Sequence, residues 1–318
     1  MMWLDSSAHC GYKRRMEIAE SYFQPLVTAL RRAGKFDAVA YTAIEPDFGD
    51  TKSELDAKWL RWVEQESYIR LVYHVYEHDI YSTLTKVRCP LLSYAELSLP
   101  LPASAELWLA PSAEAWSEAF LGTVHGKYSS LSLRDCLGDH DLVRYLPGHI
   151  DQRLARSMYV YGLASQTWEY YQQSRLAAGP RSNPDPSTQL WLQTRHQSLY
   201  KALQDMHAVS GGCLAVTRLL HEFIMMSLHV DPDQVTRFAG KCGEEEAHRA
   251  YQFLQPWSQS KLARTAVLHA GQVLFAARAV PPYQLRGMDA FLIFHATVVC
   301  TRALIVRNAS IRLIVRLT

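Results

Sequence analysis

The stretch WLRWVEQESYIRLVYHVYEHD, residues 59–79, decides the expected fold of this sequence. Its large apolar side chains recur at steps of three and four residues, with Glu66 at the one polar position of the series: Trp59, Trp62, Ile69, Tyr73, Tyr76 and Ile80. This spacing places them on one face of an α-helix. Because a buried carboxylate without a partner is costly, we expect Arg70, one turn further on, to pair with Glu66. The stretch therefore predicts a core helix with an ion pair at the edge of its buried face.

Helical patterns also cover most of the remaining chain. They occupy residues 12–34, 55–87, 187–228, 230–240, 243–255, 258–279 and 288–305. Pro25 is expected to break or kink the first helix, and Gly211-Gly212 to interrupt the 187–228 segment. Strand signals are sparse, and the prolines in LSLPLP, residues 97–102, favour an extended connection. The sequence predicts an all-α fold, an irregular multi-helix domain with short extended proline-containing connections.

Composition limits the class of protein. The chain has 318 residues, of which 48% are hydrophobic and 20% charged, and a net charge of +2. This is globular composition without a global field that would attract nucleic acid. No apolar run approaches the roughly 20 residues of a membrane span. The six cysteines contain no C-x-x-C pair, which argues against a zinc finger or a dense disulfide scaffold and favours reduced thiols.

We divide the chain into a lead-in at residues 1–19, one main domain at 20–305 and an atypical basic and apolar tail at 306–318. The loop GPRSNPDPS, residues 179–187, is a possible boundary within the main domain.

One metal motif occurs inside the core helix. His74, Glu77 and His78 follow the order H-x-x-E-H, which is typical of zinc proteases when both histidines bind one metal and the glutamate acts as base. The alternative is a solvated or half-buried histidine pair on an ordinary helix, which we favour because short motifs match often by chance. Two other groups, Asp139-His140-Asp141 and Gly211-Gly212-Cys213, are expected to form a turn and a helix break rather than a metal or nucleophile site.

The same core helix carries a family resemblance. W-x-x-W-x-x-x-E-S-x-x-R-L-x-Y, residues 59–73, followed by EHD, resembles the fungal-specific transcription factor domain, the helical middle region of fungal zinc-finger regulators. Three further segments resemble that domain in the expected order: SLPLPASAELWLAPSAEAW at 98–116, ARTAVLHAGQVLFAAR at 263–278 and VPPYQLRGMDAFLIFHATVV at 280–299. The resemblance spans about residues 20–305.

The residues that carry the resemblance are expected to be structural: Trp59, Trp62, Glu66, Arg70, Tyr73, Trp108, Trp116, His269, Gly271 and His295. Trp108 and Trp116 would anchor a helix that Ser112 caps. Gly271 would permit close approach of a second helix. His269 and His295 lie among apolar residues, and we expect them to be core histidines with satisfied hydrogen bonds.

The resemblance implies a non-catalytic regulatory domain of a fungal RNA polymerase II transcription factor, located in the nucleus. Its partners would be other transcription proteins or a second copy, with no membrane. It implies no cofactor in this chain, because zinc would belong to an upstream DNA-binding module whose cysteine and histidine spacing is absent here. A zinc-dependent hydrolase built on His74, Glu77 and His78, and a helical ligand-binding protein without a role in transcription, remain the alternatives.

Overall fold

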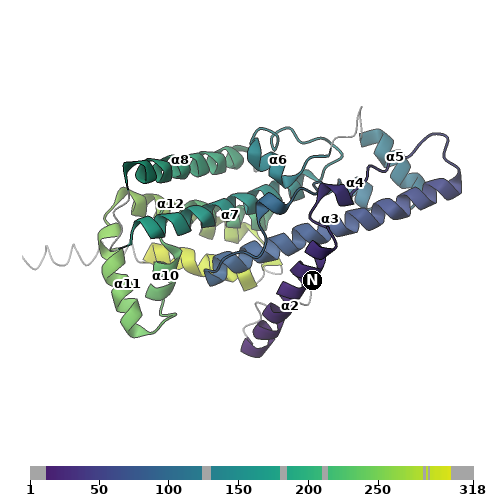
Figure 1. Cartoon of the computed structure of the whole chain (residues 1–318). Helices are drawn as coiled ribbons and strands as arrows, with labels where there is room; N and C mark the ends of the chain where they lie inside the picture. Colours follow the sequence, from purple (N-terminus) through teal and green to yellow (C-terminus); the bar gives the residue numbers. More distant parts are fainter. Residues whose placement is uncertain are drawn as a thin grey trace, which may run out of the picture. The chain divides into compact units, whose positions relative to one another are not determined.

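The computed structural model describes residues 12–123, 130–179, 185–209, 214–281, 284–285 and 287–301. Within these residues the regular backbone is helical, and only two isolated β-bridges occur, between Pro100 and Ser132 and between Ala103 and Ile150. The predicted all-α, irregular multi-helix fold is confirmed (Figure 1). The tail at 306–318 and the Gly211-Gly212-Cys213 group lie outside the described residues.

The elements follow one another along the chain with short connections. They are α2 (Lys13–Arg32), η1 (Ala38–Ala40), α3 (Lys52–Lys86), η2 (Tyr94–Glu96), α4 (Ala105–Trp108), α5 (Ala113–Thr123), α6 (Leu133–Gly138), α7 (Gln152–Ala177), α8 (Pro186–Val209), α9 (Ala215–Ser227), α10 (Pro232–Phe238), α11 (Glu244–Trp257) and α12 (Lys261–Ala279). A further helix occupies residues 287–301.

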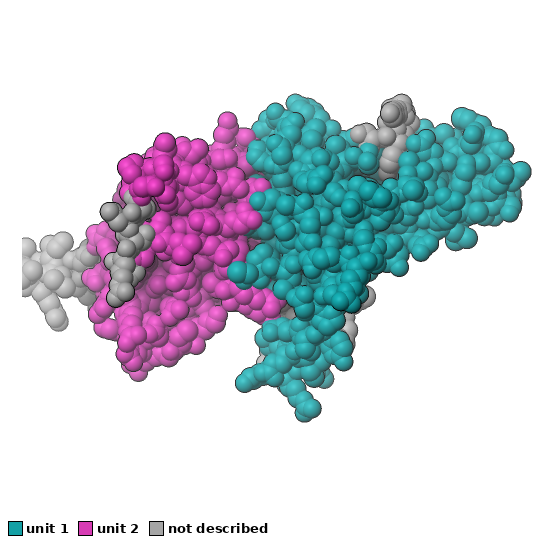
Figure 2. Space-filling view, in the orientation of Figure 1, with its two compact units in different colours: residues 1–82, 89–165, 211–213 teal, residues 83–88, 166–210, 214–318 magenta. Residues whose placement is uncertain are grey.

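The chain forms two compact units (Figure 2). Unit 1 comprises residues 1–82, 89–165 and 211–213, and unit 2 comprises residues 83–88, 166–210 and 214–318. Residues on both sides of the loop at 179–187 belong to unit 2, and the boundary expected within that loop stays a prediction.

In unit 1, the predicted core helix is α3. Trp62, Ile69, Tyr73, Tyr76 and Ile80 are all buried, as their spacing predicts. The connection around LSLPLP follows η2 and runs without helical structure as far as α4, because the prolines restrict its backbone. This places a non-helical segment beside the predicted core helix, where its backbone groups need partners.

In unit 2, α12 packs along α9, and α10 packs on α11. The sequence correctly marks both ends of α10. The Asp231 carboxylate accepts hydrogen bonds from the backbone N–H groups of Asp233 and Gln234, and Pro232 takes the first helical position. Gly240, with φ of +92°, follows the helix end in a conformation that glycine adopts without strain.

The expectation that Pro25 breaks the first helix is wrong. α2 continues through Pro25 to Arg32. Pro25 is exposed, and Ala19, Phe23, Val27 and Leu30 of the same helix are buried. The packing of that apolar face outweighs the one backbone hydrogen bond that proline cannot donate.

Candidate functional site

Three polar side chains on successive turns of α3 hold the extended segment 97–103. One oxygen of Glu66, Oε1, accepts hydrogen bonds from Arg70 Nε at 2.7 Å and from the backbone N–H of Ala103 at 3.0 Å. Arg70 also donates to the Ala103 carbonyl at 2.7 Å, and the Tyr73 hydroxyl donates to the Leu99 carbonyl at 3.2 Å. The predicted Glu66–Arg70 pair is confirmed. It forms, with Tyr73, a polar triad that satisfies backbone groups no helix or strand would pair.

Aromatic side chains pack beside this polar triad. The Trp62 and Trp116 ring centroids lie 5.7 Å apart, and Trp116 lies 5.8 Å from Phe120. The Arg70 guanidinium carbon lies 4.9 Å from the Trp108 ring centroid, a cation–π contact. Trp59 and Trp108 are partly buried against the same cluster. The Ser112 hydroxyl accepts from the backbone N–H of Ala115, which confirms it as the cap of α5.

Seven of the ten residues that carry the family resemblance therefore lie together in unit 1: Trp59, Trp62, Glu66, Arg70, Tyr73, Trp108 and Trp116. Their contacts join α3, the 97–103 segment, α4 and α5. Burial raises the pKa of Glu66 to about 7, against the opposing effects of Arg70 and the Ala103 N–H group. The sequence locates these residues, and the structure adds the backbone that they hold.

The H-x-x-E-H motif is engaged in hydrogen bonds within the protein. His74 Nδ1 lies 3.2 Å from one oxygen of Glu77, and the Tyr161 hydroxyl donates to the other oxygen at 2.9 Å. His78 is buried, with its ring centroid 4.6 Å from that of Phe23. The expected half-buried position therefore holds for His74 and is wrong for His78. In the part of the chain that the structure describes, no three histidine, cysteine or acidic side chains are placed to hold a metal ion together.

His269 belongs to a buried cluster in unit 2. Its Nδ1 lies 3.1 Å from Glu222 of α9, so this nitrogen donates to the carboxylate. Burial raises the pKa of Glu222, but hydrogen bonds from His221 and His269 outweigh this effect and lower the pKa to about 2. Nε2 of His269 is buried without a hydrogen-bond partner. The prediction of a satisfied core histidine thus holds for only one of its two nitrogens.

The neighbouring His229 is a residue that the sequence analysis missed. Its ring centroid lies 6.2 Å from that of His269 and 5.2 Å from that of Tyr200, and 7% of its surface is exposed. Neither ring nitrogen of His229 has a hydrogen-bond partner. Burial, followed by His196 and His269, lowers its pKa to about 4. No local motif marks this residue, because its neighbours come from distant helices.

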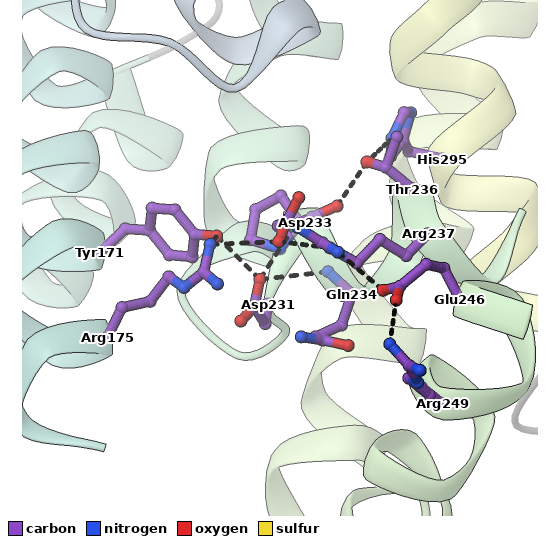
Figure 3. A network of polar contacts seen from close by, with 11 residues as sticks. Tyr171, Arg175, Asp231, Asp233, Gln234, Thr236, Arg237, Glu246, Arg249 and His295 are labelled. Carbon is purple, nitrogen blue, oxygen red and sulfur yellow. Dashed lines mark hydrogen bonds and ion pairs between the residues drawn. The ribbon is translucent and has the colours of Figure 1, made fainter. Parts of the chain in front are cut away.

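His295 meets the expectation of a satisfied core histidine. Its Nδ1 lies 2.9 Å from the Phe291 carbonyl and donates to it, and its Nε2 lies 3.1 Å from the Thr236 hydroxyl oxygen. Burial lowers its pKa to about 4. Figure 3 shows that Thr236 stands at the end of a polar network around α10, in which Asp233 contacts both Arg175 and Arg237. His295 thereby connects the helix at 287–301 to α10.

The reason given for Gly271 is wrong. Gly271 is exposed, and a Cβ built on it would have no neighbouring atom within 4 Å. The glycine that does permit close helix approach is Gly162 of α7, where an added Cβ would lie 2.7 Å from a side-chain carbon of Leu137 in α6. Nothing in the spacing of the sequence distinguishes these two glycines.

Acidification is expected to destabilise unit 2 through His229. Its imidazole takes a proton near pH 6.5 when unfolded but only near pH 4 when folded. Between these values the unfolded state binds more protons, so stability is lost as the pH falls from about 6.5 to 4, by at most about 3 kcal/mol. Urea unfolding at pH 7.5 and pH 5 measures the loss, and His229→Phe should reduce it. Equal pH dependence in the variant and the unchanged protein would contradict this prediction.

Three known fungal proteins resemble parts of this chain. Transcription factor 1 of Elsinoe fawcettii is 31% identical over 117 residues, which make up 37% of this chain and 12% of that protein. A transcription factor of Zymoseptoria tritici is 29% identical over 155 residues, 45% of this chain and 15% of that protein. Zinc finger protein zas1 of Schizosaccharomyces pombe is 30% identical over 105 residues, 33% of this chain and 12% of that protein.

The matched segments thus cover at most 15% of the length of these relatives. No family model and no solved structure matches the chain. Among the described residues, no helix has both the length and the apolar character needed to cross a bilayer. The chain has relatives among fungal proteins named as transcription factors and as a zinc finger protein.

Proposed function

We propose that this chain is a regulatory domain of a fungal RNA polymerase II transcription factor, of the fungal-specific transcription factor domain type. It acts in the nucleus, without catalysis, through contacts with other transcription proteins or with a second copy of itself. DNA contact belongs to a separate zinc module, which also accounts for the zinc. The three fungal relatives, two named as transcription factors and one as a zinc finger protein, support this proposal.

The observation that carries the proposal is the joint placement of the family-like residues. Glu66, Arg70 and Tyr73 use their polar atoms on the backbone of segment 97–103. Trp62 and Trp116 pack against each other. Residues spent in this way build a rigid scaffold rather than a reacting site, because their polar atoms are directed at the protein itself. A domain that works by packing and protein contact has this arrangement.

A tethering experiment tests the proposal. The 318-residue chain is fused to a DNA-binding module from an unrelated protein, and transcription is measured from reporters with low and with high basal output. We expect the fusion to raise or lower transcription relative to the DNA-binding module alone, because a regulatory domain recruits or restrains transcription proteins wherever it is placed.

The matched control carries Trp116→Ala, which disrupts unit 1 while leaving the DNA-binding module intact. It should lose the effect. A folded, nuclear fusion that leaves both reporters unchanged contradicts the proposal.

A further inference from the structure

Unit 1 contains a small cavity beside the polar triad. Its volume is about 140 Å³, and its walls include Tyr41, Ile44, Trp62, Ile69 and Leu101. Ile44, Trp62, Ile69 and Leu101 are buried, whereas Thr42 and Ala43 at the same cavity are exposed. The cavity is therefore lined mainly by apolar and aromatic groups and has exposed residues at one side, as small-molecule sites do.

Glu66 is the one carboxylate in the wall of this cavity. Only 3% of its surface is exposed. Oε1 carries both of its hydrogen bonds, from Arg70 and from the Ala103 N–H group. Among the described residues, no hydrogen bond is donated to Oε2. A buried carboxylate oxygen without a donor costs free energy, and a donor placed in the cavity would remove that cost.

The charge balance selects the kind of donor. Arg70 lies 2.7 Å from Glu66 and already compensates its negative charge. A ligand cation would lose its hydration on entering an apolar cavity, and Glu66 would not be free to replace that hydration. A neutral hydroxyl group needs only one acceptor, which Oε2 provides.

The size of the cavity selects the rest of the ligand. An apolar cavity of about 150 Å³ in another protein admits benzene, and this cavity has a similar volume of about 140 Å³. Aromatic side chains on the wall, Tyr41 and Trp62, can stack on or meet the edge of a ring. The space suits a single six-membered ring with one short substituent.

We infer that this cavity is a binding site for a small neutral ring compound with one hydroxyl group, which donates its hydrogen bond to Oε2 of Glu66. The site goes beyond the proposed regulatory function and does not depend on it. Binding would add a donor at the point where α3 holds segment 97–103, and would therefore stabilise unit 1.

Phenol and toluene form the matched pair of probes, because they differ in the hydroxyl group and have similar size. Binding to the full chain is measured by calorimetry and by nuclear Overhauser effects from the ring protons to the methyl groups of Ile44, Ile69 and Leu101. We expect phenol to bind with a Kd on the order of 0.1–1 mM and toluene to bind about tenfold more weakly, because only phenol satisfies Oε2. The buried methyl groups of Ile224, in unit 2, serve as the control and should show no effect.

The variant Glu66→Gln tests the role of Oε2. The glutamine oxygen can still accept from Arg70 and Ala103, so that its NH₂ group takes the place of Oε2. Phenol binding should weaken about tenfold or more, whereas Glu64→Gln, at an exposed position of the same helix, should leave it unchanged.

Three results would overturn the inference: toluene binding as tightly as phenol, Overhauser effects that miss the three cavity methyl groups, or unchanged phenol affinity in a folded Glu66→Gln variant. If that variant does not fold, the Overhauser effects and the phenol–toluene comparison in the unchanged protein still decide. A failed reporter test with retained phenol binding would reject the regulatory function alone.

Discussion

Replacing Trp116 with alanine is expected to lower the free energy of unfolding by about 3–5 kcal/mol. Trp116 is fully buried, and its ring packs against those of Trp62 and Phe120. Truncation removes these contacts and leaves a large void, which a close-packed interior refills only in part. Urea unfolding followed by circular dichroism gives the free energy. Trp62→Ala, in the same cluster, is expected to lose a similar amount.

The control for this variant is another tryptophan. Trp191 is 50% exposed, so Trp191→Ala should change the free energy of unfolding by no more than about 0.5 kcal/mol. If Trp116→Ala and Trp191→Ala have equally small effects, the aromatic cluster of unit 1 is not the core that its burial indicates.

Arg70→Ala is expected to cost about 3–5 kcal/mol, because it leaves the buried Glu66 carboxylate without its charged partner. The loss includes the hydrogen bond from Arg70 to the Ala103 carbonyl. The matched control is Arg61→Ala, at an exposed position of the same helix, which should stay within about 0.5 kcal/mol of the unchanged protein.

A double variant distinguishes the two parts of this cost. If the isolated charge is the main penalty, Glu66→Met combined with Arg70→Met should be more stable than Arg70→Met alone, because no buried charge remains. Free energies of unfolding for the two single variants and the double variant complete the cycle. Additive losses in the double variant would show that Glu66 and Arg70 are not energetically coupled.

The sequence predicts those features of the fold that depend on neighbours within a few residues. The helix face of α3, the Glu66–Arg70 pair at i and i+4, and the caps of α10 follow from spacing and side-chain chemistry alone. These interactions form whenever the local helix forms. For this reason they could be stated before any three-dimensional information.

The remaining features depend on which distant segments meet. The acceptor oxygen of Glu66 serves Ala103, 37 residues further on, and Glu77 meets Tyr161, 84 residues away. The unpartnered nitrogens of His229 have the same origin, since its ring neighbours include His269. Periodicity reports which face of a helix is buried but not what lies opposite, and for the same reason it missed the packing at Gly162.

The polar triad also bears on the order in which unit 1 assembles. Its hydrogen bonds to segment 97–103 connect residues 26, 33 and 37 positions apart. Closing such loops loses chain entropy before any bond forms, whereas α3 can propagate turn by turn from local contacts. We therefore expect α3 to form first and the segment to join it late. Weakening the triad should then speed unfolding and leave the refolding rate nearly unchanged.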